Sequence, residues 1–369
     1  MIDSHVHLRD WRQSNKETIE HGLEVAERVG LDAVFDMPNT SPVIDSYDLV
    51  KDRLEGAEFL KSKVFYGLYV GLTSNPEQVK EAVKAWEEFF PEPGASVGVV
   101  GLKMFAGSST GDLLVGKEEE QKKVYETLAK EGYEGVLAVH CEKESFLVPT
   151  MWDSSKPVTH SQSRPKEAET ASIGDQIKYA EEVGFLGNLH ICHVSVPGSV
   201  YLVGEARQRG KIKITCGVTP HHCLFGIHNI LGATTDEGLL YKVNPPIRLR
   251  SDAEKMLTLL QEGKIDWIET DHAPHTLAEK TGKALDAKGN PQYMSGFPGL
   301  PFLPHFLNFL RRRKMSEGQI YRLTHGNIIE IFGLEHLELP VRDVSPDLNL
   351  HTKYGVDVYK GLRGRLAEK

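Results

Sequence analysis

The sequence predicts an α/β fold in which eight strands and the helices that follow them close into a (β/α)8 barrel. Eight short apolar runs, rich in Val and Ile, alternate with longer amphipathic stretches along 369 residues. No Gly/Ser linker or low-complexity tract divides the chain, and polar residues gather where several apolar runs end. A doubly wound open sheet has the same alternation, so the number of strands does not separate these two folds.

The predicted elements follow from the periodicity of apolar residues. Each apolar run has strand length and is bounded by polar or turn residues. The predicted strands are residues 2–7, 33–37, 64–71, 97–105, 135–140, 188–194, 212–218 and 267–270. Amphipathic helices are predicted at residues 18–29, 76–90 and 118–130. In the first of these helices Ile19, Leu23 and Ala26 share one face.

The chain after about residue 335 has a different character. It is polar, contains Pro340 and Pro346, and holds only short apolar pieces. We therefore expect residues 1–335 to form the barrel and residues 336–369 to form a small appendage on it.

Composition excludes several classes of partner. The chain has 43 Lys and Arg against 52 Asp and Glu, a net charge of −9, so it has no cation excess for nucleic-acid phosphates. No run of about 18 apolar residues predicts a membrane span. The four cysteines form no CxxC pair. The first residues also lack the basic and apolar regions of a signal peptide, so we expect a reducing, cytoplasmic location.

The first predicted strand ends in two histidines that share a face. His5 and His7 are two residues apart, so both imidazoles can converge on one ion. Two polar residues on an exposed strand would give the same pattern, and the pair alone is weak evidence.

The fourth predicted strand contains Lys103 within an apolar run. Lysine is almost never fully buried without a partner. Lys103 therefore either extends its amine to the surface or has a chemical role.

Three further strands end in histidine or aspartate. His140 ends the fifth, His190 and His193 lie in the sixth, and Asp271 follows the eighth. Residues three apart face opposite sides of a strand, so we expect only one histidine of the sixth strand in the site, and we choose His193. An aspartate before a His-rich loop suits a metal ligand that also moves protons.

Other reactive side chains are interpreted as structural. Cys141 and Cys192 each adjoin one of these histidines, so strand alternation predicts that they face away as buried thiols. His221 and His222 follow the seventh strand and are left outside the metal set.

Together the polar residues at the strand ends indicate a metal site. Four histidines, one aspartate and one lysine occur at the ends of the first, fourth, fifth, sixth and eighth strands. Barrel enzymes place their active sites there. Nitrogen and oxygen donors without thiolates suit zinc at a hydrolytic site.

Five motifs give the chain a resemblance to a known family. They are HVHLRD at 5–10, MPNT at 37–40, GLK at 101–103, DHAPH at 271–275 and GFPG at 296–299. In this order the chain resembles dihydroorotase of the amidohydrolase superfamily, from its first residues to about residue 335. The resemblance implies an amidohydrolase-type (β/α)8 TIM barrel with a reduced C-terminal appendage, the remnant of a small β-sandwich that many relatives carry beside the barrel.

The resemblance also implies two zinc ions per chain. The matching ligand positions are His5, His7 and Asp271 for one ion and His140 and His193 for the other. Lys103 matches a lysine that carbon dioxide converts to N6-carboxylysine, whose carbamate bridges the metals.

The implied reaction is the reversible closure of N-carbamoyl-L-aspartate to L-dihydroorotate, the third step of pyrimidine (UMP) biosynthesis. In the hydrolytic direction a bridging hydroxide attacks the ring carbonyl, and Asp271 carries its proton to the leaving nitrogen. In the synthetic direction Asp271 starts protonated, so lower pH favours synthesis. The partner is thus a small molecule, and the resemblance leaves a homodimer open.

Substrate recognition is expected to depend on charge. The substrate carries a carboxylate, and Arg9 offers it a planar fork of donors. The resemblance adds contacts at Asn39, Asn244, His275, Ser295 and Gly296. The loop at residues 107–111 has two glycines and suits a mobile lid, with Thr110 as its substrate contact.

Two alternatives remain. Another cyclic-amide hydrolase, such as a hydantoinase or allantoinase, would share the metals and the lysine, but a neutral ring would not use Arg9 and Asn39. A non-catalytic homologue acting as an assembly partner would not be expected to keep every metal ligand.

Overall fold

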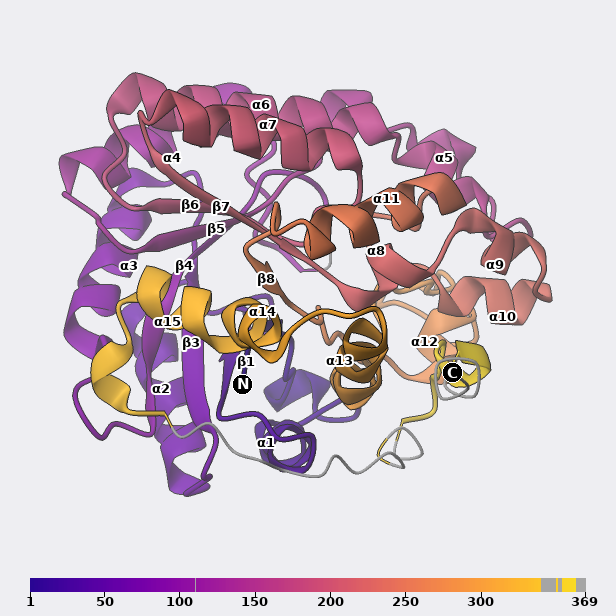
Figure 1. Cartoon of the computed structure of the whole chain (residues 1–369), viewed down its shortest axis with the longest axis horizontal. Helices are drawn as coiled ribbons and strands as arrows, with labels where there is room; N and C mark the ends of the chain where they lie inside the picture. Colours follow the sequence, from indigo (N-terminus) through magenta and orange to yellow (C-terminus); the bar gives the residue numbers. More distant parts are fainter. Residues whose placement is uncertain (110, 340–349, 351–353, 363–369) are drawn as a thin grey trace.

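The computed structural model shows one eight-stranded parallel sheet wound into a barrel (Figure 1). It describes residues 1–109, 111–339, 350 and 354–362. Each strand pairs in parallel with the next strand in the chain, from β1 to β8. A doubly wound sheet would reverse its strand order, so the predicted barrel is confirmed.

The strands agree with the predicted runs, apart from their ends. They are β1 (Ile2–Val6), β2 (Ala33–Asp36), β3 (Phe65–Gly71), β4 (Val97–Phe105), β5 (Val136–His140), β6 (Asn188–Ile191), β7 (Lys213–Val218) and β8 (Trp267–Ile268). The strands β6 and β8 end two or three residues before the predicted runs do, and each is followed by residues of the candidate site.

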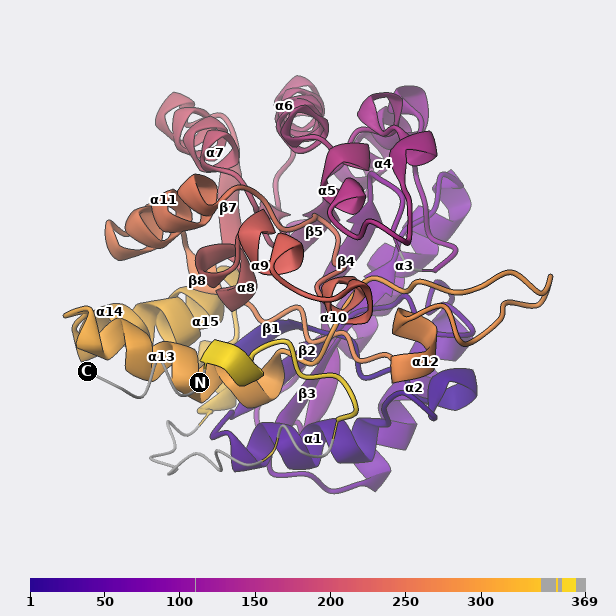
Figure 2. The same cartoon turned by 90° about the vertical axis from the view of Figure 1, so that its right-hand side faces the viewer.

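Helices surround the sheet, as Figure 2 shows in a view turned by 90° from that of Figure 1. The α-helices are α1 (Ile19–Arg28), α2 (Tyr47–Phe59), α3 (Pro76–Phe89), α4 (Glu118–Lys130), α5 (Thr159–Ser163), α6 (Lys166–Val183), α7 (Pro197–Arg209), α8 (Pro220–Leu224), α9 (Ile227–Leu231), α10 (Thr235–Leu240), α11 (Arg250–Gln261), α12 (Leu277–Lys280), α13 (Leu303–Arg312), α14 (Glu317–Tyr321) and α15 (Asn327–Phe332). Short helical turns are η1 (Trp11–Gln13), η2 (Glu144–Phe146), η3 (Pro149–Met151), η4 (Leu300–Phe302), η5 (Arg322–Gly326) and η6 (Glu335–Leu337).

Local sequence explains where helices begin and end. Thr18 caps α1 by accepting a hydrogen bond from the backbone N–H of His21. Asn75 caps α3 in the same way, and Pro76 occupies the first helical position. The helix α6 ends at Gly184, whose φ of 65° is left-handed.

The apolar core has two parts. The larger part lies between the strands and the surrounding helices. The smaller part fills the barrel, where Phe332 of α15 packs with ring centroids 4.9 Å from Phe35 and 5.9 Å from Trp267. The helix α15 therefore seals one end of the barrel, and the polar side chains occupy the other end.

The barrel closes between β8 and β1 with little backbone pairing. One bridge joins Val6 and His272, and the His7 N–H donates to the His272 carbonyl at 2.8 Å. The buried Asp3 carboxylate accepts hydrogen bonds from the backbone and hydroxyl of Thr270. Burial raises the pKa of Asp3 to about 7. This contact holds the chain that leads to Asp271.

The described part of the tail packs on the barrel. Tyr359 stacks on Phe302, with centroids 3.7 Å apart, and the Tyr354 hydroxyl donates to Glu17 at 2.7 Å. No strand occurs among residues 354–362. The division at residue 335 and the β-sandwich origin of the tail stay predictions. In the described part of the chain, no helix is long and apolar enough to cross a membrane.

Candidate active site

Three predicted ligands converge where β1 and β8 end. His7 Nε2 lies 3.0 Å from Asp271 Oδ1, and His5 Nε2 lies 3.6 Å from the same oxygen. One ligand atom from each of the three buried side chains lies within 4.8 Å of the others. The i, i+2 spacing predicted from the sequence therefore does bring both imidazoles to one place.

A second pair converges from β5 and β6. His140 Nδ1 lies 3.4 Å from His193 Nε2, and the His193 ring centroid lies 4.9 Å from that of His5. The other nitrogen of His140 faces Glu142 at 3.1 Å. All four histidines and Asp271 therefore occupy one continuous site.

The spacing of these atoms fits metal ligation. Two ligands of one tetrahedral zinc, each about 2.0–2.1 Å from the metal, lie roughly 3.3–3.4 Å apart. The observed separations of 3.0, 3.4 and 3.6 Å span that value. No hydrogen-bond partner is present for His193 Nδ1 among the described residues. The donor set and its geometry therefore fit divalent metal ions.

Burial keeps the imidazoles in the form that binds metals. It lowers the pKa of His5 to about 4, and it lowers the pKa values of His7, His140 and His193 as well. A neutral imidazole has a free lone pair for a metal. Burial also raises the pKa of Asp271, which suits a group that takes up and releases a proton.

Lys103 lies inside the barrel next to these ligands. It is wholly buried, and its charge acts on His5, His193 and Asp271. Its Nζ donates to the Cys192 thiol at 3.1 Å and lies 4.9 Å from the centre of the Phe105 ring. Lys103 therefore does not extend to the surface, and its amine faces the metal-binding region.

The structure corrects two expectations about β6. Cys192 faces the barrel interior, not away from it, whereas Cys141 packs on the helix side as predicted. His190 also faces inward, where it stacks on Trp267 with centroids 4.2 Å apart, so both histidines of this segment lie inside. The cause is local: the strand ends at Ile191, and His193 has a φ of 35°, which breaks the alternation.

Three site residues have strained backbones. Arg9, His193 and Asp271 have φ values of 49°, 35° and 48°. Such left-handed conformations are uncommon in residues other than glycine. They turn the side chains toward the site just after the strands end.

Arg9 lies in the cavity as predicted. The cavity is lined by His5, His7, Arg9, Asn39, Phe105, Ser109, His140, His193, Asn244, Asp271, Ala273, Ser295 and Gly296. Arg9 is 1% exposed, and its Nη1 has no hydrogen-bond partner among the residues that the structure describes. It forms no ion pair with a carboxylate in the described part of the chain, although its Nη2 lies 3.1 Å from His275 Nε2.

The other predicted substrate contacts have roles within the protein. Asn39 Oδ1 lies 2.7 Å from His7 Nδ1, and Asn244 Oδ1 lies 3.0 Å from His160 Nε2. Ser295 Oγ accepts from the Lys242 ammonium at 2.8 Å. Both Asn39 and Asn244 still line the cavity. Asn39 in particular orients His7 with its Nε2 toward Asp271.

Gly296 lines the cavity, and His275 lies next to the lining residue Arg9. Gly296 has a φ of 121°, and a Cβ there would lie 2.7 Å from Ala273. Its N–H donates to the Lys242 carbonyl. His275 is not one of the lining residues, and its Nε2 lies 3.0 Å from the Ser295 carbonyl. Thr110, the predicted lid contact, lies outside the described residues.

Sequence reasoning missed two buried carboxylates. Glu142 pairs with His140 and with Arg164, whose Nη2 also donates to the Ser108 carbonyl in the loop at 107–111. Glu269 lies two residues before Asp271 and faces inward. The same i, i+2 rule that was applied to His5 and His7 could have found it.

His222 is a structural histidine beside the site. Its Nδ1 lies 2.9 Å from the Thr219 hydroxyl and its Nε2 lies 3.0 Å from the Pro245 carbonyl, so both nitrogens have partners. This agrees with leaving His222 outside the metal set. Burial lowers its pKa to about 3.

That pKa predicts a loss of stability in acid. The unfolded chain protonates this imidazole below about pH 6.5, whereas the folded chain does so only near pH 3. Going from pH 7 to pH 5 should therefore cost the folded state about 2 kcal/mol through His222. Urea unfolding of metal-free protein at pH 7 and pH 5 measures this change. The free energy of unfolding should fall by about 2 kcal/mol less in His222→Asn than in the wild type. An equal drop in both proteins would contradict the prediction.

Solved structures show the same fold. An L-hydantoinase (dihydropyrimidinase) from Arthrobacter aurescens superposes with a TM-score of 0.76 over 92% of this chain and 72% of its own, at 22% identity. A dihydropyrimidinase from Brevibacillus agri gives a TM-score of 0.73 over 90% and 70%, at 21% identity. At these identities the likeness shows the fold alone, a (β/α)8 barrel that in this chain carries a cluster of histidines and carboxylates able to hold a metal ion.

Sequence relatives define the family to which this barrel belongs. No protein-family model matches the chain. A dihydroorotase from Brevibacillus brevis is 34% identical over 350 residues, covering 92% of this chain and 75% of the relative. A dihydroorotase from Deinococcus radiodurans is 33% identical and covers 81% and 67%. The chain belongs to the dihydroorotase family of cyclic-amide hydrolases.

Proposed function

We propose that this chain interconverts L-dihydroorotate and N-carbamoyl-L-aspartate, with Arg9 as the residue that selects the substrate. The observation that carries this proposal is the buried Arg9 guanidinium, which lines the cavity and whose Nη1 has no partner in the described part of the chain. A buried cation without a carboxylate partner is costly. A substrate carboxylate would supply the missing partner in bidentate geometry.

Two zinc ions and a carboxylated Lys103 complete the proposal. His5, His7 and Asp271 would hold one ion, and His140 and His193 would hold the other. Lys103, with its amine beside these side chains, would supply the bridging carbamate. When bound, the ions supply Lewis-acid activation of the ring carbonyl and of water.

The protein's own side chains then bind, orient and move protons. Arg9 holds the substrate carboxylate and Asn39 keeps His7 in its ligating orientation. During hydrolysis the ring amide C–N bond breaks, the carbonyl carbon gains a water oxygen, and Asp271 transfers a proton from that water to the leaving nitrogen. Ring closure reverses each step, so Asp271 starts protonated and lower pH favours synthesis.

The solved neighbours include hydantoinases, which raises the alternative of a neutral cyclic-amide substrate. Their identities to this chain, 22% or less, show the fold alone. Arg9 favours the charged substrate, because hydantoin has no carboxylate to pair with it.

Ultraviolet-monitored hydrolysis tests the proposal directly. Purified protein is assayed with L-dihydroorotate, hydantoin and allantoin, and its metal content is determined on the same sample. We expect turnover of dihydroorotate alone and about two zinc ions per chain. Turnover of the neutral rings without dihydroorotate would overturn the substrate assignment. Absence of both metal and turnover, after zinc and bicarbonate are supplied, would favour a non-catalytic homologue.

Replacing Arg9 with methionine should chiefly weaken substrate binding. A hydrogen-bonded charge contact contributes about 1.5–3 kcal/mol, which corresponds to about a 10- to 100-fold lower kcat/KM for dihydroorotate. Arg9→Lys keeps the charge but not the planar fork of donors, so its kcat/KM should lie between those of the wild type and Arg9→Met. Steady-state kinetics with unchanged KM and kcat/KM in Arg9→Met would remove Arg9 from carboxylate recognition.

A further inference from the structure

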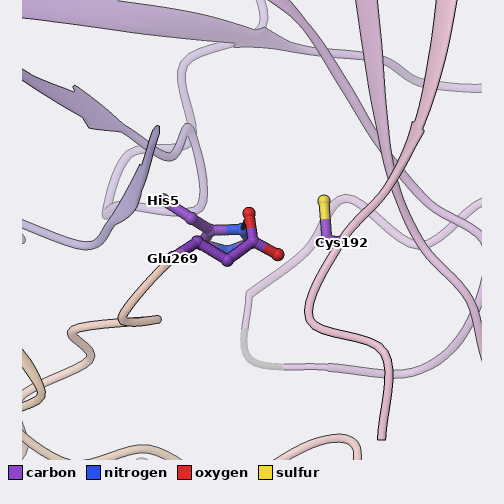
Figure 3. Close-up of side chains that lie close together, drawn as sticks. All are labelled: His5, Cys192 and Glu269. Atoms are coloured by element: carbon purple, nitrogen blue, oxygen red, sulfur yellow. Dashed lines mark ion pairs between the residues drawn. The ribbon is translucent and has the colours of Figure 1, made fainter. Parts of the chain in front are cut away.

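Glu269 directly follows β8, and its carboxylate lies inside the barrel beside His5 of β1, His190 of β6 and His193, which follows β6. His193 donates its backbone N–H to Oε1, and His190 Nε2 lies 3.3 Å from Oε2. His5 Nδ1 lies 3.6 Å from the same oxygen. Figure 3 shows the side chains of His5, Cys192 and Glu269 gathered at this place.

The neighbouring strand leaves room for this carboxylate. Gly217 of β7 has no side chain, and a Cβ at that position would lie 2.6 Å from Cδ and Oε1 of Glu269. Glu269 itself is 1% exposed. Burying a carboxylate is costly unless charge or hydrogen bonds compensate it, and here three histidines surround it.

The two nitrogens of His5 face different groups. Nε2 faces Asp271, on the side where the other predicted ligands converge, and Nδ1 faces Glu269. Nδ1 has no hydrogen-bond partner within the described residues. A carboxylate on this side favours the tautomer with a proton on Nδ1, which leaves the lone pair on Nε2 for a metal.

We propose that Glu269 is a positioning residue for both predicted metal sites. Through the His5 ring it fixes a ligand of one ion, and through the His193 backbone it fixes a ligand of the other. This inference rests on the proposed metal site. It assigns no contact between Glu269 and the substrate.

Metal affinity tests the role. Wild type, Glu269→Gln and Glu269→Ala are loaded with zinc, and retention is measured by competition with a chelator. Glutamine is nearly the same size as glutamate, and its amide oxygen can still accept from the His193 N–H. Its amide NH₂, however, is a donor and would favour a lone pair on His5 Nδ1. The proton of His5 would then sit on Nε2, the nitrogen that is predicted to bind the metal. We expect zinc affinity to fall about 10-fold in Glu269→Gln and up to about 100-fold in Glu269→Ala.

Glu169→Gln is the matched control. Glu169 is also 1% exposed and accepts hydrogen bonds from Ser195 and Ser199, but it contacts no predicted metal-ligand side chain. We expect it to keep wild-type zinc affinity even if its thermal unfolding temperature falls. Substituting Co²⁺ gives a second readout, because the absorption bands of the metal should change in Glu269→Gln and not in Glu169→Gln.

The outcomes separate this inference from the proposed function. Wild-type zinc affinity and an unchanged Co²⁺ spectrum in Glu269→Gln would overturn the positioning role, as would an equal loss in Glu169→Gln. If Glu269→Ala does not fold, Glu269→Gln decides. A wild-type protein that binds zinc but does not hydrolyse dihydroorotate would refute the substrate and leave this inference standing. A wild-type protein that binds no metal would overturn both.

Discussion

Replacing Asp271 with asparagine is expected to lower kcat for dihydroorotate hydrolysis by about 10²- to 10⁴-fold, the usual contribution of a positioned acid–base group. Asparagine keeps an oxygen in place, whereas Asp271→Ala removes a ligand as well and should abolish turnover. Asp271 is the one acidic residue among the described residues that line the cavity, where its carboxylate lies 3.0 Å from His7. No other described carboxylate in that lining is therefore placed to replace it.

Metal analysis of the same variants separates the two roles of Asp271. If Asp271→Asn retains the wild-type zinc content and loses activity, the loss reflects proton transfer. Substantial remaining kcat at full zinc content would remove Asp271 from that role. A pH profile measured in both reaction directions should lose its dependence on this carboxyl in Asp271→Asn.

Replacing Lys103 with alanine is expected to empty the metal site. Lys103 is the proposed source of the carbamate that both ions would share. The zinc content should therefore fall from about two ions to below one ion per chain. Activity should fall by about a thousand-fold or more. Zinc content and dihydroorotate turnover are measured on the same samples.

A short carboxylate added in solution provides the control for Lys103→Ala. Truncation leaves a space beside Cys192 that a small anion can enter, so acetate or propionate should restore part of the zinc content and activity. The same additive should not increase wild-type activity. Full zinc content and activity in Lys103→Ala without any additive would contradict the role of the lysine.

The sequence was sufficient for the features that follow from periodicity. Eight apolar runs separated by helices favoured the barrel, although they left a doubly wound sheet open, and the i, i+2 spacing of His5 and His7 predicted their convergence. Both features depend on regular strands, in which side chains alternate. His140 was predicted at the end of the fifth apolar run, and it is the last residue of β5.

Prediction failed where the backbone departs from a strand. Alternation placed Cys192 outside and allowed only one of His190 and His193 inside, but the chain turns at His193 and brings all three inward. The i, i+2 rule could have placed Glu269 on the same face as Asp271, but the space that its carboxylate occupies depends on Gly217, a residue of another strand. Contacts of this kind depend on which strands are neighbours, which local patterns do not specify.

The left-handed backbones of Arg9, His193 and Asp271 have a consequence for heat resistance. Each such conformation costs about 1–3 kcal/mol in a residue other than glycine, so the rest of the barrel must compensate for this strain. In the metal-free protein, glycine or asparagine at these positions would relieve this strain and make the fold more resistant to heat. A library selected only for survival at high temperature should therefore accumulate such substitutions at the mouth of the barrel and lose catalysis. In this protein the demands of activity and of thermal endurance conflict at three identifiable residues.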